Sequence, residues 1–163
     1  MDAIEMLKTR RSVRSYTQEP VPKDVIEDIV DCGRLAATAR NEQPWEFVVV
    51  TDPQVRRRLA GLAVNGPFIA DSPVCIVTVC KDGMYYVEDG SAATQNMLLA
   101  ARAHGLGSCW VAGDKKPYAQ AVLDVVGAPA GYKLVSLIAL GNTTAAPKPA
   151  KRSLTDVLHW EQF

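Results

Sequence analysis

Three arginines stand close together near the start of the chain, at Arg10, Arg11 and Arg14, and Ser12 lies among them. A guanidinium group is a planar, permanently charged donor that suits phosphate, and a serine hydroxyl adds a short directional hydrogen bond. Residues 7–17 contain no acid that would neutralise these cations. The cluster therefore indicates a binding site for an anion, while a solvated helix end explains the same residues equally well.

Two further segments carry groups that suit a flat heterocycle. Asn41 and Gln43 each combine a donor and an acceptor in one amide, which can read the polar edge of a ring system. Gly113 follows an apolar run, where a glycine lets backbone N–H groups approach a ligand without a side chain in the way. Both segments also have a purely structural interpretation. Asn41 and Gln43 can belong to a loop that brings Trp45 into the core, and Gly113 can be an ordinary turn glycine.

A second group of cations lies near the C-terminus, at Lys148, Lys151 and Arg152. The two groups can neutralise one phosphate if the fold brings them together.

Composition limits the kinds of protein that this chain can be. It has 163 residues, of which 48% are apolar, and its 18 Lys and Arg are balanced by 18 Asp and Glu. The length predicts one domain over residues 1–163, and the balanced charge argues against nucleic acid or an anionic membrane as a partner. No apolar run approaches the roughly 20 residues of a membrane span, and residues 1–5 lack the pattern of a signal peptide. We therefore expect a soluble cytoplasmic protein.

Cysteine and histidine offer little chemistry of their own. The four cysteines form no C-x-x-C pair and indicate reduced core residues, and a chain with only His104 and His159 cannot build a His-rich metal site. His104 precedes Gly105 and indicates a helix end. Since no side chain stands out as a catalytic group, an enzyme of this composition is expected to use a bound cofactor and no metal.

The predicted elements begin with two helices and continue as strands separated by helices. This order predicts an α+β fold around a mixed or antiparallel sheet of four strands, with room for a fifth strand from a second chain. The dinucleotide-binding fingerprint is absent, because Gly105 and Gly107 follow a helix and enter a strand. The predicted helices cover residues 2–10, 23–38, 53–63, 91–104 and 116–126, and the predicted strands cover residues 47–50, 74–80, 108–112 and 134–140.

Two segments are more apolar than a small domain requires. The helix predicted over residues 91–104 is apolar on more than one side, which indicates burial at the centre or against another subunit. The tail carries Leu154, Trp160 and Phe163 and must dock either on its own domain or on a partner.

Five segments, in order along nearly the whole chain, resemble the nitroreductase family of FMN-dependent oxidoreductases. One such motif is weak evidence, and five in order are strong. They are R-R-S-V-R-x-Y from Arg10, N-x-Q-P-W from Asn41, residues 89–101 with their core Q-N-M-L-L-A-A, G-L-G-S-C-W-V-A-G from Gly105, and G-Y-K-L-V-S-L-I-A-L-G-N from Gly131.

This resemblance implies a nitroreductase-like α+β fold in an interlocked homodimer, with two FMN molecules at the subunit interface. The helix over residues 91–104 would form the dimer core, and the tail would wrap the partner. By motif position, the FMN-binding residues would be Arg10, Arg11, Ser12 and Arg14 at the phosphate and ribityl chain, Asn41 and Gln43 along the ring, the backbone of Ala112 and Gly113 at the nitrogen that accepts hydride, and Lys151 or Arg152 over the phosphate.

The resemblance also implies the reaction. NADH or NADPH gives hydride to the flavin and leaves, and a nitroaromatic compound, a quinone or a similar acceptor then takes its place in a ping-pong cycle. The flavin itself carries this chemistry, so no side chain receives a catalytic role.

Three departures from the family pattern bear on specificity. The stretch over residues 59–72 is too compact for a substrate-covering insertion, Ala39 and Arg40 replace small serine-type residues, and Ala112 stands where some relatives carry an acid. They keep open an alternative function, a flavin-binding or storage protein without nicotinamide turnover. A nucleic-acid binding module built on the arginine cluster fits the balanced charge least well.

Overall fold

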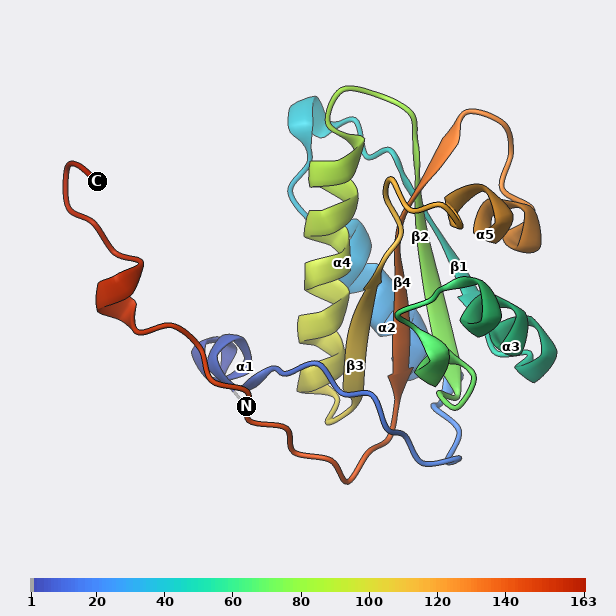
Figure 1. Ribbon diagram of the computed structural model, residues 1–163, viewed down its shortest axis with the longest axis horizontal. Helices are drawn as coiled ribbons and strands as arrows, with labels where there is room; N and C mark the ends of the chain where they lie inside the picture. Colours follow the sequence, from blue (N-terminus) through green and yellow to red (C-terminus); the bar gives the residue numbers. More distant parts are fainter. Residues whose placement is uncertain (1) are drawn as a thin grey trace.

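Four antiparallel strands form the sheet at the centre of the fold (Figure 1). The computed structural model describes residues 2–163. The strands lie in the spatial order β1-β2-β4-β3, so β1 and β3 are the edges of the sheet. The prediction of an α+β fold with a four-stranded sheet is confirmed, and its strand pairings are antiparallel. The bounds are β1 (Trp45–Val50), β2 (Val74–Lys81), β3 (Gly107–Ala112) and β4 (Tyr132–Gly141).

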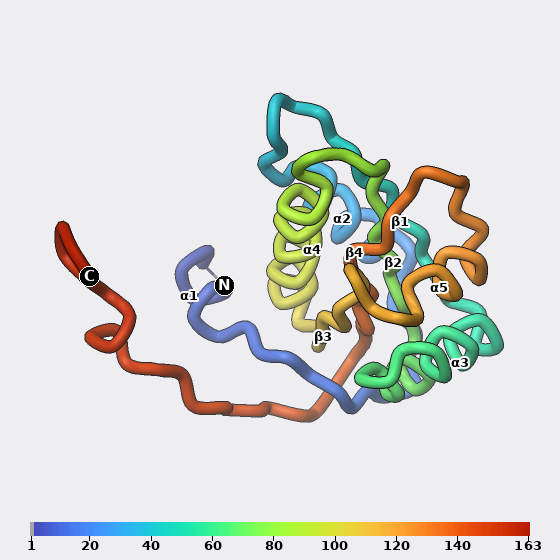
Figure 2. The backbone as a smooth tube through the Cα atoms, turned by 45° about the horizontal axis from the view of Figure 1, so that its top comes forward, coloured from blue at the N-terminus to red at the C-terminus, as the bar shows by residue number. Residues whose placement is uncertain are grey.

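Helices cover both faces of the sheet, as Figures 1 and 2 show. On one face lie α2 (Lys23–Arg34) and α4 (Tyr86–Ala103), and on the other lie α3 (Pro53–Leu62) and α5 (Ala119–Val126). Because side chains alternate along a strand, Ile76 of β2 packs towards α2 and α4, whereas Val77 packs towards α3 and α5. The unbroken apolar run of β2 is thus buried on both faces, as its sequence predicts.

The long helix α4 lies very close to the sheet. A Cβ atom added at Gly90 would lie 2.7 Å from Cγ2 of Val135 and 2.8 Å from the sulfur of Cys80. Four residues later, the hydroxyls of Thr94 and Ser136 are hydrogen-bonded at 2.8 Å, in the buried space between helix and sheet. The first half of α4 is therefore held in a fixed position against the sheet, and the loops around it can pack on a rigid element.

Local capping signals agree with the structure better than the predicted helix lengths do. Asp52 caps α3 by accepting hydrogen bonds from the backbone N–H groups of Gln54 and Val55, as its place before Pro53 predicts. These two bonds lower the pKa of Asp52. At the other end of a helix, His104 is the C-cap of α4, which confirms the predicted helix end.

Three predicted helix boundaries were wrong, and tertiary contacts account for the differences. Helix α2 ends at Arg34 instead of 38, because Thr38 is already extended and directs its hydroxyl towards α4. Helix α4 begins at Tyr86, five residues before the predicted start, because Gly90 packs against the sheet instead of breaking the helix. Helix α5 begins at Ala119 instead of 116, after a turn in which Lys115 has a φ of 55°.

Both ends of the chain lie beside the domain instead of in its core (Figures 1 and 2). Helix α1 (Ala3–Thr9) has no buried residue. The tail runs away from its own domain, and Leu154 and Trp160 are 70% and 79% exposed. In the structure of the single chain, the tail therefore does not pack on its own domain. The three short 3-10 helices are η1 (Ala39–Asn41), η2 (Pro67–Ile69) and η3 (Leu154–Asp156).

No helix within residues 2–163 combines the length and the apolar character needed to cross a membrane.

Candidate functional site

The segment from Arg10 to Arg14 runs along the free edge of β3. Ser12 and Ser108 form a parallel bridge there, and the backbone N–H of Val13 donates to the Ser108 carbonyl at 2.9 Å. The bridge fixes the arginine cluster at the start of the strand, which the figures show as the lower end of the sheet edge (Figure 1). The predicted basic turn is therefore part of an ordered edge.

The buried thiol of Cys109 has several members of the cluster as neighbours. Burial raises the pKa of Cys109, whereas Arg14, a hydrogen bond with Ser12, and Arg10 act against that rise. The segment that carries Arg10, Ser12 and Arg14 therefore lies beside Ser108 and Cys109, the second and third residues of β3.

Two aromatic side chains support the end of this segment. The Arg14 guanidinium lies 5.9 Å from the centroid of the Phe68 ring, in a cation–π contact. The hydroxyl of Tyr16 donates to the carbonyls of Val13 and Ala139 at 2.6 and 3.2 Å, and burial raises its pKa. Tyr16 therefore anchors the segment to β4 and has a structural role.

Arg11 has a different environment from its two neighbours. Its Nη1 donates at 2.8 Å to the carbonyls of Lys8 and Arg10, at the end of α1. Its Nε is buried and has no hydrogen-bond partner among residues 2–163. Arg11 thus caps the carbonyl end of α1, a role expected of a cation at that position.

A cavity of about 460 Å³ lies between the end of α1, the loop before β3 and the segment after β4. No Asp or Glu lines it among the described residues, so all the charged side chains of its lining are cations. The charged residues that line this cationic cavity are Lys8, Arg10, Arg11, Arg102 and Lys148.

Only some residues of the N-terminal and C-terminal cation groups identified in the sequence line this cavity. Lys148 shares it with Arg10, because the hydroxyl of Thr143 donates to the Ser15 carbonyl at 2.8 Å and ties the two segments together. Lys151 and Arg152 do not line the cavity, and Arg152 donates to the Asp156 carbonyl within the tail.

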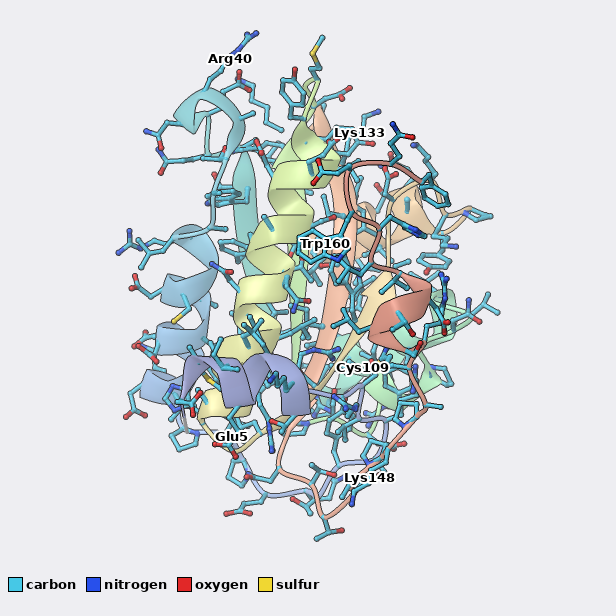
Figure 3. The ribbon with its side chains drawn as sticks, turned by 90° about the vertical axis from the view of Figure 1, so that its left-hand side faces the viewer. Glu5, Arg40, Cys109, Lys133, Lys148 and Trp160 are labelled. Carbon is cyan, nitrogen blue, oxygen red and sulfur yellow. The ribbon has the colours of Figure 1, made fainter. Side chains whose placement is uncertain are left out.

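The loop that carries Asn41 and Gln43 has a strained backbone. Arg40, Asn41 and Gln43 have φ values of 53°, 57° and 49°, in the left-handed region that non-glycine residues seldom adopt. Each such residue destabilises the fold by roughly 1 kcal/mol or more unless its surroundings hold it. All three side chains are exposed. Figure 3 shows Arg40 and Lys148 at opposite ends of the molecule, with Cys109 between them.

At the far end of β3, the two predicted backbone positions differ. The N–H of Gly113 donates to the Val135 carbonyl at 3.0 Å, and a Cβ atom there would lie 2.4 Å from Cγ of Leu134. Gly113 is therefore required for packing against β4. Hydrogen-bonding directions alternate along a strand, so the outward carbonyl of Ser108 places the backbone groups of Ala112 on the free edge.

The Ala112 carbonyl accepts a hydrogen bond from the Tyr118 hydroxyl, which agrees with this outward direction. The Tyr118 hydroxyl therefore already bonds to the Ala112 carbonyl. At this end of β3, the Ala112 N–H is the backbone group that remains to donate to a ligand.

Sequence reasoning missed three residues that shape the site. Arg102 lines the cationic cavity and donates through Nε to the Thr9 hydroxyl at 3.3 Å, while Asp89 and Thr38 hold the loop that carries Asn41. The burial of Asp89 could have been predicted from the sequence. Asp89 precedes Ala93 by four residues and Met97 by eight, and residues at this spacing lie on the same face of a helix, here the buried face of α4.

Fold and site together define an α+β protein with a sheet edge at β3, which has a cationic cavity at one end and the outward-facing backbone N–H of Ala112 at the other. Such an edge suits an elongated ligand with an anionic end. The family description "Nitroreductase family" matches the chain over residues 7–73 and 65–142. The chain belongs to the nitroreductase family.

Individual relatives agree with this assignment. A provisionally named NADH dehydrogenase/NAD(P)H nitroreductase of Archaeoglobus fulgidus is 34% identical over 148 residues, 86% of this chain and 84% of that protein. One of the same name from Methanothermobacter thermautotrophicus is 36% identical over 115 residues, 68% of this chain and 60% of that protein. A nitroreductase structure from Desulfovibrio desulfuricans, in complex with FMN, superposes with a TM-score of 0.88 at 28% identity and covers 100% of this chain and 99% of that one.

Proposed function

We propose that this protein is an FMN-dependent oxidoreductase that passes hydride from NADH or NADPH to an acceptor such as a nitroaromatic compound or a quinone. The observation that carries the proposal is the shared edge of β3. The cations at Ser108 and the N–H of Ala112 lie at opposite ends of it, roughly 13 Å apart at about 3.3 Å per residue. That spacing suits a ligand with a phosphate at one end and a flat ring at the other.

The phosphate end is assigned to cations that gather at the start of β3. Arg10, Ser12 and Arg14 would hold the phosphate and ribityl chain by charge-assisted hydrogen bonds. Lys148 lines the cationic cavity together with Arg10 and would be the C-terminal cation of this end, and Lys151 and Arg152 follow it in the tail. Arg11 supports this end by capping α1.

The ring end is assigned to the N–H of Ala112 and to the amides of Asn41 and Gln43. FMN, when bound, supplies the ring that accepts hydride from the nicotinamide and gives it to the acceptor. The Ala112 N–H offers a preorganised donor where negative charge develops, the arrangement by which a protein lowers such a barrier. Gly113 contributes through packing, because its own N–H is bonded within the sheet.

We also propose that residues 1–163 form a single FMN-binding domain that works as a homodimer. Large exposed apolar side chains gather outside the core: Ile4 and Leu7 of α1, and Leu154, Trp160 and Phe163 of the tail. Clusters of this kind mark interaction surfaces. In the proposed dimer, α4 lies at the centre of the interface and the tail covers the partner.

Anaerobic reduction of the purified protein tests the proposed activity. The protein is expected to be yellow, and its visible flavin band is expected to bleach with NADH or NADPH and to recover when an acceptor from a panel of nitroarenes and quinones is added. A colourless protein that also fails to bind added FMN contradicts the proposal. A yellow protein that neither nicotinamide bleaches supports the storage alternative, which the compact stretch around η2 motivates.

A further inference from the structure

Asp89 is a buried carboxylate near the start of α4. Its residue is only 4% exposed, and no Lys, Arg or His pairs with it among residues 2–163. A buried charge without an ion-pair partner requires hydrogen-bond donors. Both of its donors come from one loop: the Thr38 hydroxyl reaches Oδ2 at 2.9 Å, and the backbone N–H of Ala39 reaches Oδ1 at 2.9 Å.

The bonds continue from Thr38 into the strained part of that loop. The Thr38 oxygen accepts the backbone N–H of Gln43 at 3.1 Å, and Nε2 of Gln43 donates to the Asn41 carbonyl at 3.3 Å. Asp89 is thus joined through one hydroxyl to both amide residues. Since Arg40, Asn41 and Gln43 are all in the left-handed region, these bonds supply the external support that such a backbone needs.

The support is firm because the helix beneath it cannot shift. Gly90 packs against Val135 and Cys80 at a distance that excludes even a methyl group. The next turn of the helix is tied to β4 through Thr94 and Ser136. A carboxylate on this part of α4 therefore has a fixed position relative to the sheet edge.

We propose that Asp89 is a positioning residue that holds the loop over residues 38–43 in the one conformation that presents Asn41 and Gln43 to the flavin ring. This inference rests on the proposed function, because it needs FMN beside that loop. It predicts that Asp89 controls the affinity and the electronic environment of the flavin although it does not contact the ring.

The test compares four variants as purified full-length proteins. Asp89→Asn places an NH₂ group against donors, and Thr38→Val removes the hydroxyl relay but keeps the carboxylate. Thr38→Ser restores the hydroxyl, and Glu88→Gln neutralises the exposed neighbouring carboxylate on the same helix as a matched control. The measurements are the dissociation constant of FMN by fluorescence, the midpoint potential of the bound flavin, the shape of its visible band, and the melting temperature.

We expect Asp89→Asn and Thr38→Val to weaken FMN binding about tenfold or more, because a loop that has lost a hydrogen bond to a charged group must then be ordered when FMN binds. We also expect both to shift the midpoint potential and alter the visible band, while Thr38→Ser and Glu88→Gln stay within about twofold of the wild type. A merely structural role would lower the melting temperature and leave the potential of the remaining bound flavin unchanged.

The possible failures are distinguishable. If the wild type binds FMN and both Asp89→Asn and Thr38→Val keep its affinity and potential, the positioning role is wrong and the proposed function stands. If the wild type binds no FMN, the proposed function and this inference fall together. If Asp89→Asn does not fold, the comparison of Thr38→Val with Thr38→Ser decides the matter.

Discussion

Tyr86 donates a 2.5 Å hydrogen bond to Oδ1 of Asp114, and this bond joins the first turn of α4 to the turn that follows β3. Asp89, one turn further along α4, holds the loop that carries Asn41. The start of one helix thus fixes two segments, the end of the free edge and the amide loop. These are the segments that we assign to the ring end of the site.

Replacing Tyr86 with Phe is expected to destabilise the fold by about 1 kcal/mol at neutral pH, since one side-chain hydrogen bond is lost. The bond to Asp114, with burial as a smaller cause, raises the pKa of Tyr86 from 10.0 to about 12. A raised pKa means that the neutral phenol favours the folded state, so its contribution is complete below pH 10 and disappears as the pH approaches 12.

Denaturant unfolding at neutral pH and near pH 12 checks this expectation, with Tyr85→Phe, on an exposed neighbour, as the control. The difference between wild type and Tyr86→Phe is expected to shrink at the higher pH. A difference that persists unchanged would show that the hydroxyl contributes in some other way.

Removal of the Arg14 guanidinium tests the phosphate end of the site. Loss of a charge-assisted contact to phosphate reduces binding by about 1.5–3 kcal/mol, so Arg14→Ala is expected to retain FMN at least tenfold less tightly. The fold is expected to survive, because Arg14 is exposed and its contact is with the Phe68 ring. Equilibrium dialysis against FMN measures the effect, and Arg57→Ala on the exposed side of α3 is the control. Equal flavin content in both variants would show that Arg14 does not bind the phosphate.

A chain lacking residues 154–163 tests the role of the tail. The tail contributes no buried residue to its own domain, so we expect the truncated chain to keep its secondary structure and lose dimer stability. Sedimentation at several concentrations detects this as a weaker association. A truncated chain that remains a dimer as tight as the full-length one would place the interface elsewhere.

Gly113 and Gly61 form a matched pair for the packing of β3. A Cβ atom at Gly113 would lie 2.4 Å from Cγ of Leu134, so Gly113→Ala is expected to destabilise the fold by about 1–3 kcal/mol. At Gly61, inside α3, an added Cβ meets nothing within 4 Å, and Gly61→Ala is expected to stabilise the fold by roughly 0.5–1 kcal/mol. Thermal unfolding of the two variants gives opposite shifts if this packing is correct. Shifts of the same sign would contradict it.

Local patterns predicted the elements of this fold, and tertiary contacts decided the details that patterns missed. The apolar run of β2 and the cap at Asp52 are local signals, and both agree with the structure. The sequence analysis placed the start of α4 five residues too late. Gly90 lies inside this helix because a Cβ atom there would lie 2.7 Å from Val135, a residue far away in the sequence.

In the site, too, local sequence patterns predicted some features and tertiary contacts decided the others. Arg10, Ser12 and Arg14 are neighbours in the sequence, so their spacing alone indicated a cluster, and the segment that carries them lies beside the start of β3 in the structure. Arg102 joins the cationic cavity only because α4 ends beside α1, and no local pattern carries that information. The hydrogen bonds from Thr38 and Ala39 to Asp89 join this loop to a residue about 50 positions away in the sequence, so they were not predictable from the loop itself.

The open edge of β3 exposes the ligand-free chain to aggregation. An unpaired strand edge is a template on which another strand can add, and proteins usually block such edges. Here the N-terminal segment covers the start of the edge at Ser108, and the backbone of Ala112 is left facing outwards. A ligand seated along β3 would remove that template, so the cofactor of this protein would also serve as its protection against aggregation.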